Sequence, residues 1–391
     1  MKYAHQYMRS AETIIGLYDG TVPLAVFLKQ HFAIQKKFGS RDRRFISHLC
    51  YCYYRMGHAS LHLPVSKRIQ MALFLCEPSP GVWSDLFETP LLENWSDALP
   101  ARIQYLQSVE PSFSIGSVFP WQEALSLTID ANGFACSHFI QPLLFLRIRP
   151  GYEKIVPQKL KDAAIAFQSL NEHCIGLANA SKIDTLIAID QEAVVQDYNS
   201  QRVGEKLPAN ISTVWDCCAA SGGKSILAKD ILKKIDLTVS DIRFSILQNL
   251  KQRFIRAGIQ QYQAFVADLA SGKSVATAKK YSLIICDVPC SGSGTWSRTP
   301  EQLYYFEQER IDHYASLQQK IVRTAQHHLE ENGYLLYITC SVFKKENEEQ
   351  VSFIQQNFPL ELLSMELLKG YDRRADSLFT ALFKKRAHPA G

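Results

Sequence analysis

The segment that most constrains the fold is the tight turn inside Trp-Asp-Cys-Cys-Ala-Ala-Ser-Gly-Gly-Lys-Ser, residues 215–225. The apolar and β-branched residues 211–215 are typical of a buried strand. Residues 226–234 place apolar side chains at helical spacing and end with two lysines. Gly222 and Gly223 permit the sharp turn and a close approach of the backbone. A strand, a small-residue turn and a helix predict a parallel sheet that can meet a ligand at its carboxyl edge.

Two nucleotide-binding motifs are excluded at this turn. Gly223-Lys-Ser225 imitates the end of a phosphate-binding loop, but that loop needs a glycine where Cys218 stands. The three spaced glycines of a dinucleotide-binding turn are also absent. By itself the turn is best explained as a tight connection, and the rest of the chain decides its function.

The composition is that of a folded protein with several domains. The chain has 391 residues, of which 47% are apolar and 21% are charged, so it can form two or three cores. Its net charge of +5 fits a polyanionic partner without requiring one. The sequence has no signal peptide, no apolar run near the ~20 residues that cross a bilayer, and no zinc-type spacing among its ten cysteines. We therefore expect a cytoplasmic monomer without membrane contact or bound metal.

Residues 1–112 are predicted to be helical, because apolar residues recur every three or four positions over about 11–57. Ser40 is placed to cap a helix. Five basic residues surround that turn, and a solvated helix face explains them slightly better than an RNA contact does. They are Lys36, Lys37, Arg41, Arg43 and Arg44.

Residues 113–205 are predicted to form a small α+β unit. A helix is expected to start near Pro120, and an alternating segment that carries Arg147 and Arg149 predicts a strand. A second helix over about 157–170 and a strand over 185–189 follow. The two arginines are candidate contacts to a phosphate backbone, although ordinary exposed strand residues fit the pattern equally well.

From about residue 207 onward strands and helices alternate, which predicts a parallel sheet with helices on both faces. Functional groups in such a sheet gather beyond the carboxyl ends of the strands. The segment 378–383 is expected to close the sheet as an edge strand. Five residues stand at or near predicted strand ends: Asp216, Asp241, Asp268, Asp287 and Cys340.

Several acids at the ends of strands favour a nucleoside-bearing cofactor. A single such acid is commonly a helix cap. Asp241, however, follows the second strand, where a carboxylate can accept hydrogen bonds from the ribose hydroxyl groups. Because the chain has no phosphate cradle, S-adenosylmethionine fits better than a dinucleotide. This cofactor carries a ribose and an adenine with a sulfonium and no phosphate.

Two cysteines are candidate reactive groups. Cys290 lies in Asp287-Val-Pro-Cys-Ser-Gly-Ser-Gly-Thr295, and Cys340 lies in Thr339-Cys-Ser-Val342. Cysteines are usually buried structural residues. Here proline and glycine make Cys290 a loop residue, and Cys340 sits where this architecture keeps reactive groups. Both thiols can therefore line one cleft.

With these motifs the carboxyl half resembles the catalytic domain of the RsmB/Nop2/Sun family of RNA cytosine-5 methyltransferases. Asp216-Cys-Cys-Ala-Ala-Ser-Gly-Gly-Lys224 is similar to the family's Asp-x-Cys-Ala-Ala-Pro-Gly-Gly-Lys, with Ser221 in place of proline. The Asp-Val-Pro-Cys290 segment is similar to the Asp-Ala-Pro-Cys motif. Thr-Cys340-Ser-Val, followed by Glu346-Asn-Glu, is similar to the motif with the nucleophile.

The resemblance weakens toward the amino terminus. Residues 195–201 are similar to the family's lead-in to the catalytic domain, and Phe145-Leu-Arg-Ile-Arg is similar to its RNA-binding subdomain. Arg41-Asp-Arg-Arg-Phe and the helical texture around it resemble the NusB-like extension of the bacterial branch.

The resemblance implies three domains and an RNA partner. They are a NusB-like helical domain (1–112), a small α+β RNA-binding subdomain (113–205) and a Rossmann-like methyltransferase domain (206–391). The implied reaction transfers a methyl group from S-adenosylmethionine to C5 of a cytidine in ribosomal RNA, of the 16S type.

The resemblance also implies roles for individual residues. Cys340 would attack C6 of the cytosine, Asp287 would hold its N3 edge, and Cys290 would assist release. The implied cofactor-binding residues are Cys218, Ala219, Ala220, Ser221, Gly222, Gly223, Lys224, Asp241, Asp268 and Asp287. The implied RNA-binding residues are Arg147, Arg149 and Lys224.

Two other functions compete with this one. A DNA cytosine-5 methyltransferase would use Cys290, which follows a proline, as the attacking thiol; the second cysteine and the helical extension argue against that. A non-catalytic RNA-binding factor for ribosome assembly would need neither cysteine. Assays of cofactor binding and methyl transfer separate these possibilities.

Overall fold

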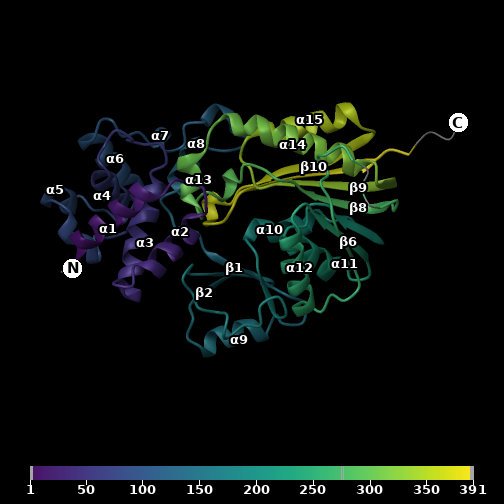
Figure 1. Ribbon diagram of the computed structural model, residues 1–391, viewed down its shortest axis with the longest axis horizontal. Coiled ribbons are helices and arrows are strands. Elements are labelled where there is room, and N and C mark those ends of the chain that lie inside the picture. The colour runs from purple at the N-terminus through teal and green to yellow at the C-terminus, as the bar shows by residue number, and fades with distance from the viewer. Residues whose placement is uncertain (1–2, 274, 276, 388–391) are drawn as a thin grey trace. The chain divides into compact units, whose positions relative to one another are not determined.

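The computed structural model describes residues 3–273, 275 and 277–387, and within them the chain forms two compact units (Figure 1). The helical unit comprises the residues up to Leu125, with Asp130–Gln141 and Thr295–Glu307. The α/β unit comprises Ser126–Ile129, Pro142–Gly294 and the residues from Gln308 onward. The three predicted domains, 1–112, 113–205 and 206–391, stay a prediction about which parts fold independently.

The helical unit confirms the helical character predicted for the first part of the chain. One helix begins at Ser40, but Ser40 does not cap it. The Asp42 carboxylate accepts a hydrogen bond from the Gly39 N–H at 2.8 Å instead. The helix expected near Pro120 is only a short 3-10 turn. The elements are α1 (Ala4–Leu17), α2 (Leu24–Ile34), α3 (Ser40–Arg55), α4 (Val65–Cys76), η1 (Gly81–Leu86), α5 (Thr89–Glu93), α6 (Leu99–Val109), α7 (Ile115–Val118), η2 (Gln122–Ala124), α8 (Ala131–Ser137) and α13 (Pro300–Tyr305).

The α/β unit contains a four-stranded sheet of order β2-β3-β1-β4. Its elements are β1 (Leu144–Ile148), α9 (Ile155–Asp162), β2 (Phe167–Asn171), β3 (Cys174–Leu177) and β4 (Ala193–Val195). The helix predicted over 157–170 is too long, because Ala164 adopts a φ of 52° and the Ile165 N–H closes the helix end onto the Leu160 carbonyl. The strand predicted over 185–189 is also wrong, since the Ile187 N–H bonds to the Ile183 carbonyl in a turn.

The larger sheet has seven strands in the order β10-β11-β9-β8-β5-β6-β7. Strands β5 to β9 run parallel, as predicted, and β11 and β10 are antiparallel additions. The segment 378–383, predicted to be an edge strand, lies inside β11 between β9 and β10, so β10 forms that edge. The strands are β5 (Thr213–Asp216), β6 (Asp236–Asp241), β7 (Gln263–Val266), β8 (Tyr281–Asp287), β9 (Leu329–Thr339), β10 (Leu360–Leu368) and β11 (Leu378–Lys385).

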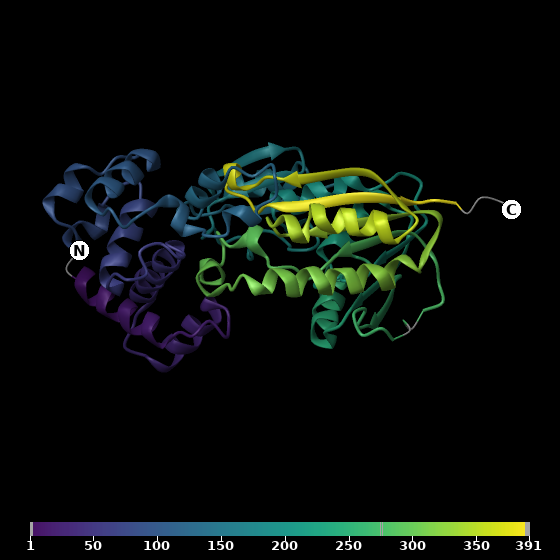
Figure 2. The ribbon, with the colours of Figure 1, turned by 90° about the horizontal axis from the view of Figure 1, so that it is seen from above.

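Helices cover both faces of this sheet, as the alternating pattern predicts (Figure 1). On one face, Ile285 of β8 packs with apolar residues of α11 (Gly223–Leu232) and α12 (Phe244–Arg256). On the other face, Ile284 packs with α14 (Glu309–Gln326) and α15 (Glu348–Asn357), which lie side by side in Figure 2. The remaining helical segments are α10 (Tyr198–Arg202), η3 (Val203–Lys206), η4 (Ser293–Thr295), η5 (Lys344–Glu346) and η6 (Tyr371–Arg373). The structure therefore confirms a Rossmann-like arrangement.

Across the described ranges, each helix is too short or too polar to cross a bilayer. This finding concerns helices only.

A buried ion-pair network fastens the small sheet to helix α11. Asp230 of α11 accepts from Arg147 Nη1 at 2.6 Å and from Arg149 Nη2 at 2.7 Å. Arg147 also donates to the Gln196 side chain, and Arg149 to the carbonyl oxygen of Ala257. Arg147 is only 5% exposed. Both arginines therefore make packing contacts inside the α/β unit, unlike the ordinary exposed strand residues that the sequence left as the alternative, and their role as RNA contacts stays a prediction.

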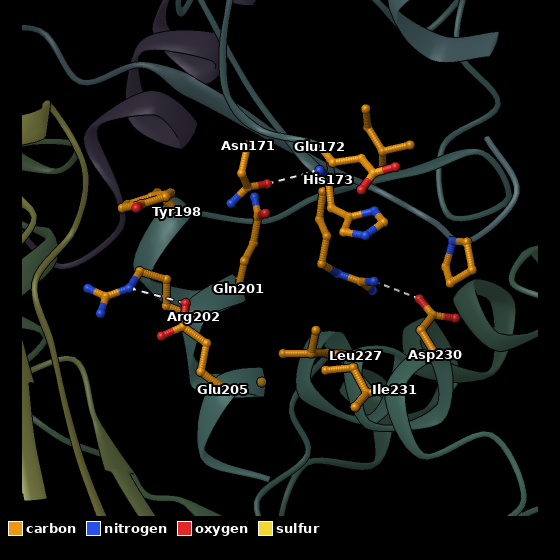
Figure 3. A pocket seen from close by; sticks show the side chains of 14 residues that line it. Asn171, Glu172, His173, Tyr198, Gln201, Arg202, Glu205, Leu227, Asp230 and Ile231 are labelled. Carbon is orange, nitrogen blue, oxygen red and sulfur yellow. Dashed lines mark hydrogen bonds and ion pairs between the residues drawn. The ribbon is translucent and has the colours of Figure 1, made fainter. Parts of the chain in front are cut away.

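The same network borders a hollow of about 470 Å³, shown in Figure 3. Asp230 and Ile231 of α11 form one wall, and Tyr198 and Gln201 of α10 form another. Of the residues predicted for the catalytic site or the cofactor, none lines this hollow among the described residues.

We expect Asp230→Asn to destabilise the protein by about 3–5 kcal/mol, because two buried guanidinium groups lose their compensating charge. Urea unfolding followed by circular dichroism measures this as a lower midpoint at constant slope. Asp236→Asn is the matched control. It breaks an exposed ion pair with Lys279 and should cost at most about 1 kcal/mol. Equal midpoints for the two variants would contradict the proposed importance of the buried network.

Candidate active site

The turn after β5 is held by hydrogen bonds to both neighbouring strands. The Cys217 N–H donates to the Ile285 carbonyl of β8 at 3.0 Å, and the Ala219 N–H to the Ser240 carbonyl of β6 at 2.9 Å. Gly222 has a φ of 84°, and a Cβ there would lie 2.7 Å from the ring of Phe254. A glycine is therefore required for both backbone conformation and space.

A cavity of about 510 Å³ opens at the carboxyl ends of the parallel strands. It brings together seven of the residues predicted from the sequence, which come from five separate segments of the chain. They are Cys218, Ala220, Asp241, Asp268, Asp287, Cys290 and Cys340. Asp268 is exposed and lies two residues beyond the end of β7, where its carboxylate accepts from the Ala270 N–H.

The other predicted cofactor residues shape the turn without lining the cavity. Ala219 and Gly222 are buried, and Gly223 and Lys224 begin helix α11. Ser221 stands on the outer side, where both its carbonyl and its hydroxyl accept from Arg253 Nη1 at 3.0 Å. Arg253 thus ties down the position at which the resembling family has a proline.

Sequence reasoning missed several residues that line the cavity. Ile242 and Arg243 directly follow the predicted acid of β6, so their position in the chain was a usable signal. Leu317 and Ile321 come from α14 at a spacing of four residues. Such a pair is indistinguishable from any other apolar helix face until the helix is packed.

Asp241 is surrounded by donors at the end of β6. Oδ1 accepts from the backbone N–H and the Nε of Arg243, and Oδ2 accepts from Arg243 Nη2 and the Ala220 N–H, all at 2.9–3.2 Å. Burial acts to raise the pKa of Asp241, but these hydrogen bonds outweigh it and lower the pKa below its usual value. Asp241 is therefore an ionised acceptor on the cavity wall.

Lys224 and Asp287 form an ion pair beside the cysteines. Lys224 Nζ donates to Asp287 Oδ2 at 3.1 Å and to the Ser200 hydroxyl at 2.9 Å. Burial acts to lower the pKa of Lys224, but the Asp287 charge outweighs this and raises it. The lysine thus stays an ammonium ion, while the Asp287 side chain, 31% exposed, reaches the cavity.

The two cysteines meet at the ends of adjacent parallel strands. Asp287 of β8 is in register with Ile338 of β9, and the loops beyond them place the Cys290 and Cys340 sulfur atoms 3.2 Å apart. A hydrogen bond with Cys340, burial and the charge of Glu346 raise the pKa of the Cys290 thiol well above its usual value. Cys340 in turn interacts electrostatically with Lys224.

Within the described residues, no group of three or more histidine, cysteine or acidic side chains is arranged to hold a metal ion.

The α/β part is similar to known methyltransferases. Residues 206–381 match the family model described as 16S rRNA methyltransferase RsmB/F. The ribosomal RNA small subunit methyltransferase B of Xanthomonas campestris pv. campestris is 30% identical over 205 residues, 50% of this chain and 47% of that protein. The probable enzyme of that name from Bacillus subtilis is 27% identical over 58% of this chain and 54% of its own. The aligned regions span about half the length of these relatives.

Solved structures support the fold. The crystal structure of PH0851 covers 97% of this chain and 98% of its own, with a TM-score of 0.71 and 19% identity. NSun6 from Pyrococcus horikoshii with SFG covers 73% of this chain and 98% of its own, with a TM-score of 0.57 and 14% identity. These similarities concern the arrangement of the backbone.

We expect Asp216→Asn to flatten the pH dependence of stability between about pH 4 and pH 7. The Asp216 carboxyl lies beneath the turn, accepts from the Ser225 hydroxyl at 2.6 Å, and burial raises its pKa to about 7. An unfolded aspartate ionises near pH 3.9. Between these values the folded state holds an extra proton, so the free energy of unfolding falls by up to about 1.4 kcal/mol per pH unit as pH rises.

The measurement is urea unfolding of both proteins from pH 4.5 to pH 8, because the difference between the curves isolates this carboxyl. Asp184→Asn, at an exposed position, is the control and should leave the pH dependence unchanged. Parallel curves for wild type and Asp216→Asn would contradict the prediction.

Proposed function

We propose that this chain, whose residues 206–381 match the model of the 16S rRNA methyltransferase RsmB/F family, methylates C5 of a cytidine in small-subunit ribosomal RNA. The observation that carries the proposal is the pair of thiols, Cys290 and Cys340, 3.2 Å apart on the wall of the strand-end cavity. One thiol alone fits many functions. Two thiols from separate motifs at one sheet edge fit a reaction that forms a covalent bond and later breaks it.

The chemistry of cytosine explains the need for a nucleophile. C5 is a poor nucleophile until a thiolate adds at C6, because that addition turns the C5–C6 double bond into an enamine-like system. The Cys340 Sγ–C6 bond forms as electron density moves onto C5. After methyl transfer the C5 proton leaves, the Sγ–C6 bond breaks and the double bond returns, so Cys340 is regenerated. S-adenosylmethionine supplies the electrophilic methyl group when it is bound.

Asp287 and Lys224 are suited to the N3 edge of the base. Negative charge builds at N3 while the thiolate adds, and a nearby proton donor lowers the energy of that state. The Asp287 carboxyl reaches the cavity and holds the Lys224 ammonium at 3.1 Å. This pair can therefore share a proton with N3 or neutralise its charge.

The surroundings of Cys290 support different roles for the two sulfurs. A hydrogen bond with Cys340, burial and the charge of Glu346 raise the pKa of the Cys290 thiol well above its usual value, which favours a protonated thiol at that position. We therefore assign the attack to Cys340 and assistance in release to Cys290. The mechanism of a DNA cytosine-5 methyltransferase, with Cys290 attacking, would need a Cys290 thiolate, which these surroundings disfavour.

The cavity has the acceptor and the apolar lining that S-adenosylmethionine requires. Asp241 is an ionised carboxylate, only 6% exposed, on the cavity wall at the end of β6. Ribose hydroxyls can bind there if they replace the guanidinium of Arg243, which is 58% exposed and therefore able to swing away. Ile242, Leu317 and Ile321 provide apolar surface suited to an adenine.

We expect Asp241→Ala to weaken S-adenosylmethionine binding at least about tenfold, because charge-assisted hydrogen bonds to the ribose are lost. Isothermal titration calorimetry measures the affinity, and a smaller ligand-induced rise in melting temperature reports it independently. Asp236→Ala, at the exposed start of the same strand, is the control and should bind as the wild type does. Stabilisation of the protein by NAD or ATP, and none by S-adenosylmethionine, would refute the proposed cofactor.

Replacing each cysteine separately should give different products with RNA. Cys340→Ser should abolish methyl transfer and form no covalent protein–RNA species, since a hydroxyl without a dedicated base is a poor nucleophile. Cys290→Ala should form the bond and fail to break it. That variant should accumulate an adduct that survives denaturing electrophoresis and shrinks to a small remnant on RNase digestion.

Cys136→Ala, in the helical unit, is the control and should transfer methyl groups without accumulating an adduct. The mirror image, with adduct in Cys340→Ser and none in Cys290→Ala, would show that Cys290 attacks. Methyl transfer intact in both variants would exclude the covalent mechanism. Bisulfite sequencing of total RNA from cells with and without the protein identifies the target cytidine.

A further inference from the structure

Glu346 is a fully buried carboxylate held only by neutral hydrogen-bond donors among its recorded contacts. Its Oε2 accepts from the backbone N–H of Ser291 and from Gln318 Nε2, both at 2.9 Å. Its Oε1 accepts from the Ser341 hydroxyl at 2.6 Å. Burial raises the pKa of Glu346, while these hydrogen bonds act to lower it. Burying a carboxylate costs folding free energy unless hydrogen bonds or an opposite charge compensate it. Here three neutral donors provide that compensation.

Two of the three donors occupy equivalent places in the two cysteine loops. Ser291 directly follows Cys290, and Ser341 directly follows Cys340. One carboxylate therefore joins the loop after β8 to the loop after β9. Its Oε2 accepts a hydrogen bond from the first loop and its Oε1 accepts one from the second. The two serine hydroxyls also lie 3.1 Å apart, so the bridge is closed on itself.

Glu346 is itself anchored from beneath. The Tyr337 hydroxyl, on β9, donates to the Glu346 carbonyl at 2.8 Å, and the next residue, Asn347, accepts from the Thr339 hydroxyl at 2.6 Å. Gln318 holds Oε2 from helix α14. The carboxylate is thus a fixed reference point to which both loops attach.

We propose that Glu346 is a positioning residue that sets the distance between the Cys290 and Cys340 sulfur atoms through hydrogen bonds to Ser291 and Ser341. This inference rests on the proposed function for its importance in catalysis, but the spacing of the sulfurs can be measured without RNA. Attack and release act on one nucleotide, and a displacement of about 1 Å can cost about 100-fold in rate.

Closure of a disulfide between the two cysteines reports their spacing directly. An azo oxidant such as diamide accepts two electrons and two protons from the two thiols, the Sγ–Sγ bond forms, and the azo group becomes a hydrazine. Sulfurs 3.2 Å apart need only a small movement to reach the bond length of about 2.05 Å. Mass spectrometry of the tryptic peptides that contain Cys290 and Cys340 follows the rate.

We expect Glu346→Ala to close this disulfide at least about tenfold more slowly than the wild type, because the loops lose their shared acceptor. Glu346→Gln keeps the size and one acceptor oxygen, so it should recover the wild-type rate to within about threefold. Ser341→Ala keeps the carboxylate but removes the donor to Oε1, together with the contacts of that hydroxyl to Ser291, Ser293 and the Phe343 N–H. It should also close more slowly than the wild type, which provides a test if Glu346→Ala fails to fold. Glu349→Gln, at an exposed position of α15, should close as the wild type does.

The catalytic readout separates positioning from simple destabilisation. In Glu346→Ala, kcat for methyl transfer should fall about 100-fold, while the KM for RNA and the affinity for S-adenosylmethionine stay within about twofold. Equal closure rates in Glu346→Ala and wild type would overturn the proposal. If Glu346→Ala closes the disulfide slowly but the wild-type protein itself transfers no methyl group, the spacing role is supported and the proposed function is refuted.

Discussion

The pairing of strands β8 and β9 is the interaction on which the site depends. Its register aligns Asp287 with Ile338, and the Val288 N–H donates to the Ile338 carbonyl at 3.1 Å. A slip of one residue would turn every side chain of one strand to the opposite face, and the two cysteine loops would leave from different places. Gly294 keeps the loops close, because its N–H donates to the Cys340 carbonyl at 2.8 Å and a Cβ there would lie only 3.0 Å from that oxygen. The sulfur contact is therefore a consequence of sheet register and close packing.

Charged groups lie close to this contact. The Lys224 ammonium donates to Asp287 at 3.1 Å, and the Glu346 carboxylate accepts from Ser291 and Ser341, the residues that follow the two cysteines. A hydrogen bond with Cys340, burial and the charge of Glu346 raise the pKa of the Cys290 thiol well above its usual value. The surroundings of Cys290 thus come from distant segments of the chain, and the Cys-Ser sequence common to both motifs does not determine them.

The parts of the site that could be predicted follow from short-range patterns. A parallel sheet gathers the carboxyl ends of its strands at one edge, so the acids and Cys340 at strand ends were expected to converge. Asp241, Asp268, Asp287 and Cys340 do line one cavity, while Asp216 is buried beneath the turn. The parts that the sequence did not indicate depend on distant partners. Arg147 pairs with Asp230, which lies 83 residues further along the chain, and local spacing contains no information about that pairing. The place of β11 inside the sheet depends on β10, whose pattern did not indicate a strand.

The surroundings of Asp241 show why a predicted binding residue is only part of a binding site. A carboxylate has about four acceptor positions, and Arg243 together with the Ala220 N–H already supplies four donors. Ribose hydroxyls can bind only in exchange for the Arg243 guanidinium, so the affinity for a cofactor reflects the difference between two sets of hydrogen bonds. The Ala220 and Arg243 backbone N–H groups donate to Asp241 with or without the cofactor, because the turn and the end of β6 hold them in place. The exposed guanidinium is the exchangeable component, and its release couples entry of the cofactor to a rearrangement at the cavity rim.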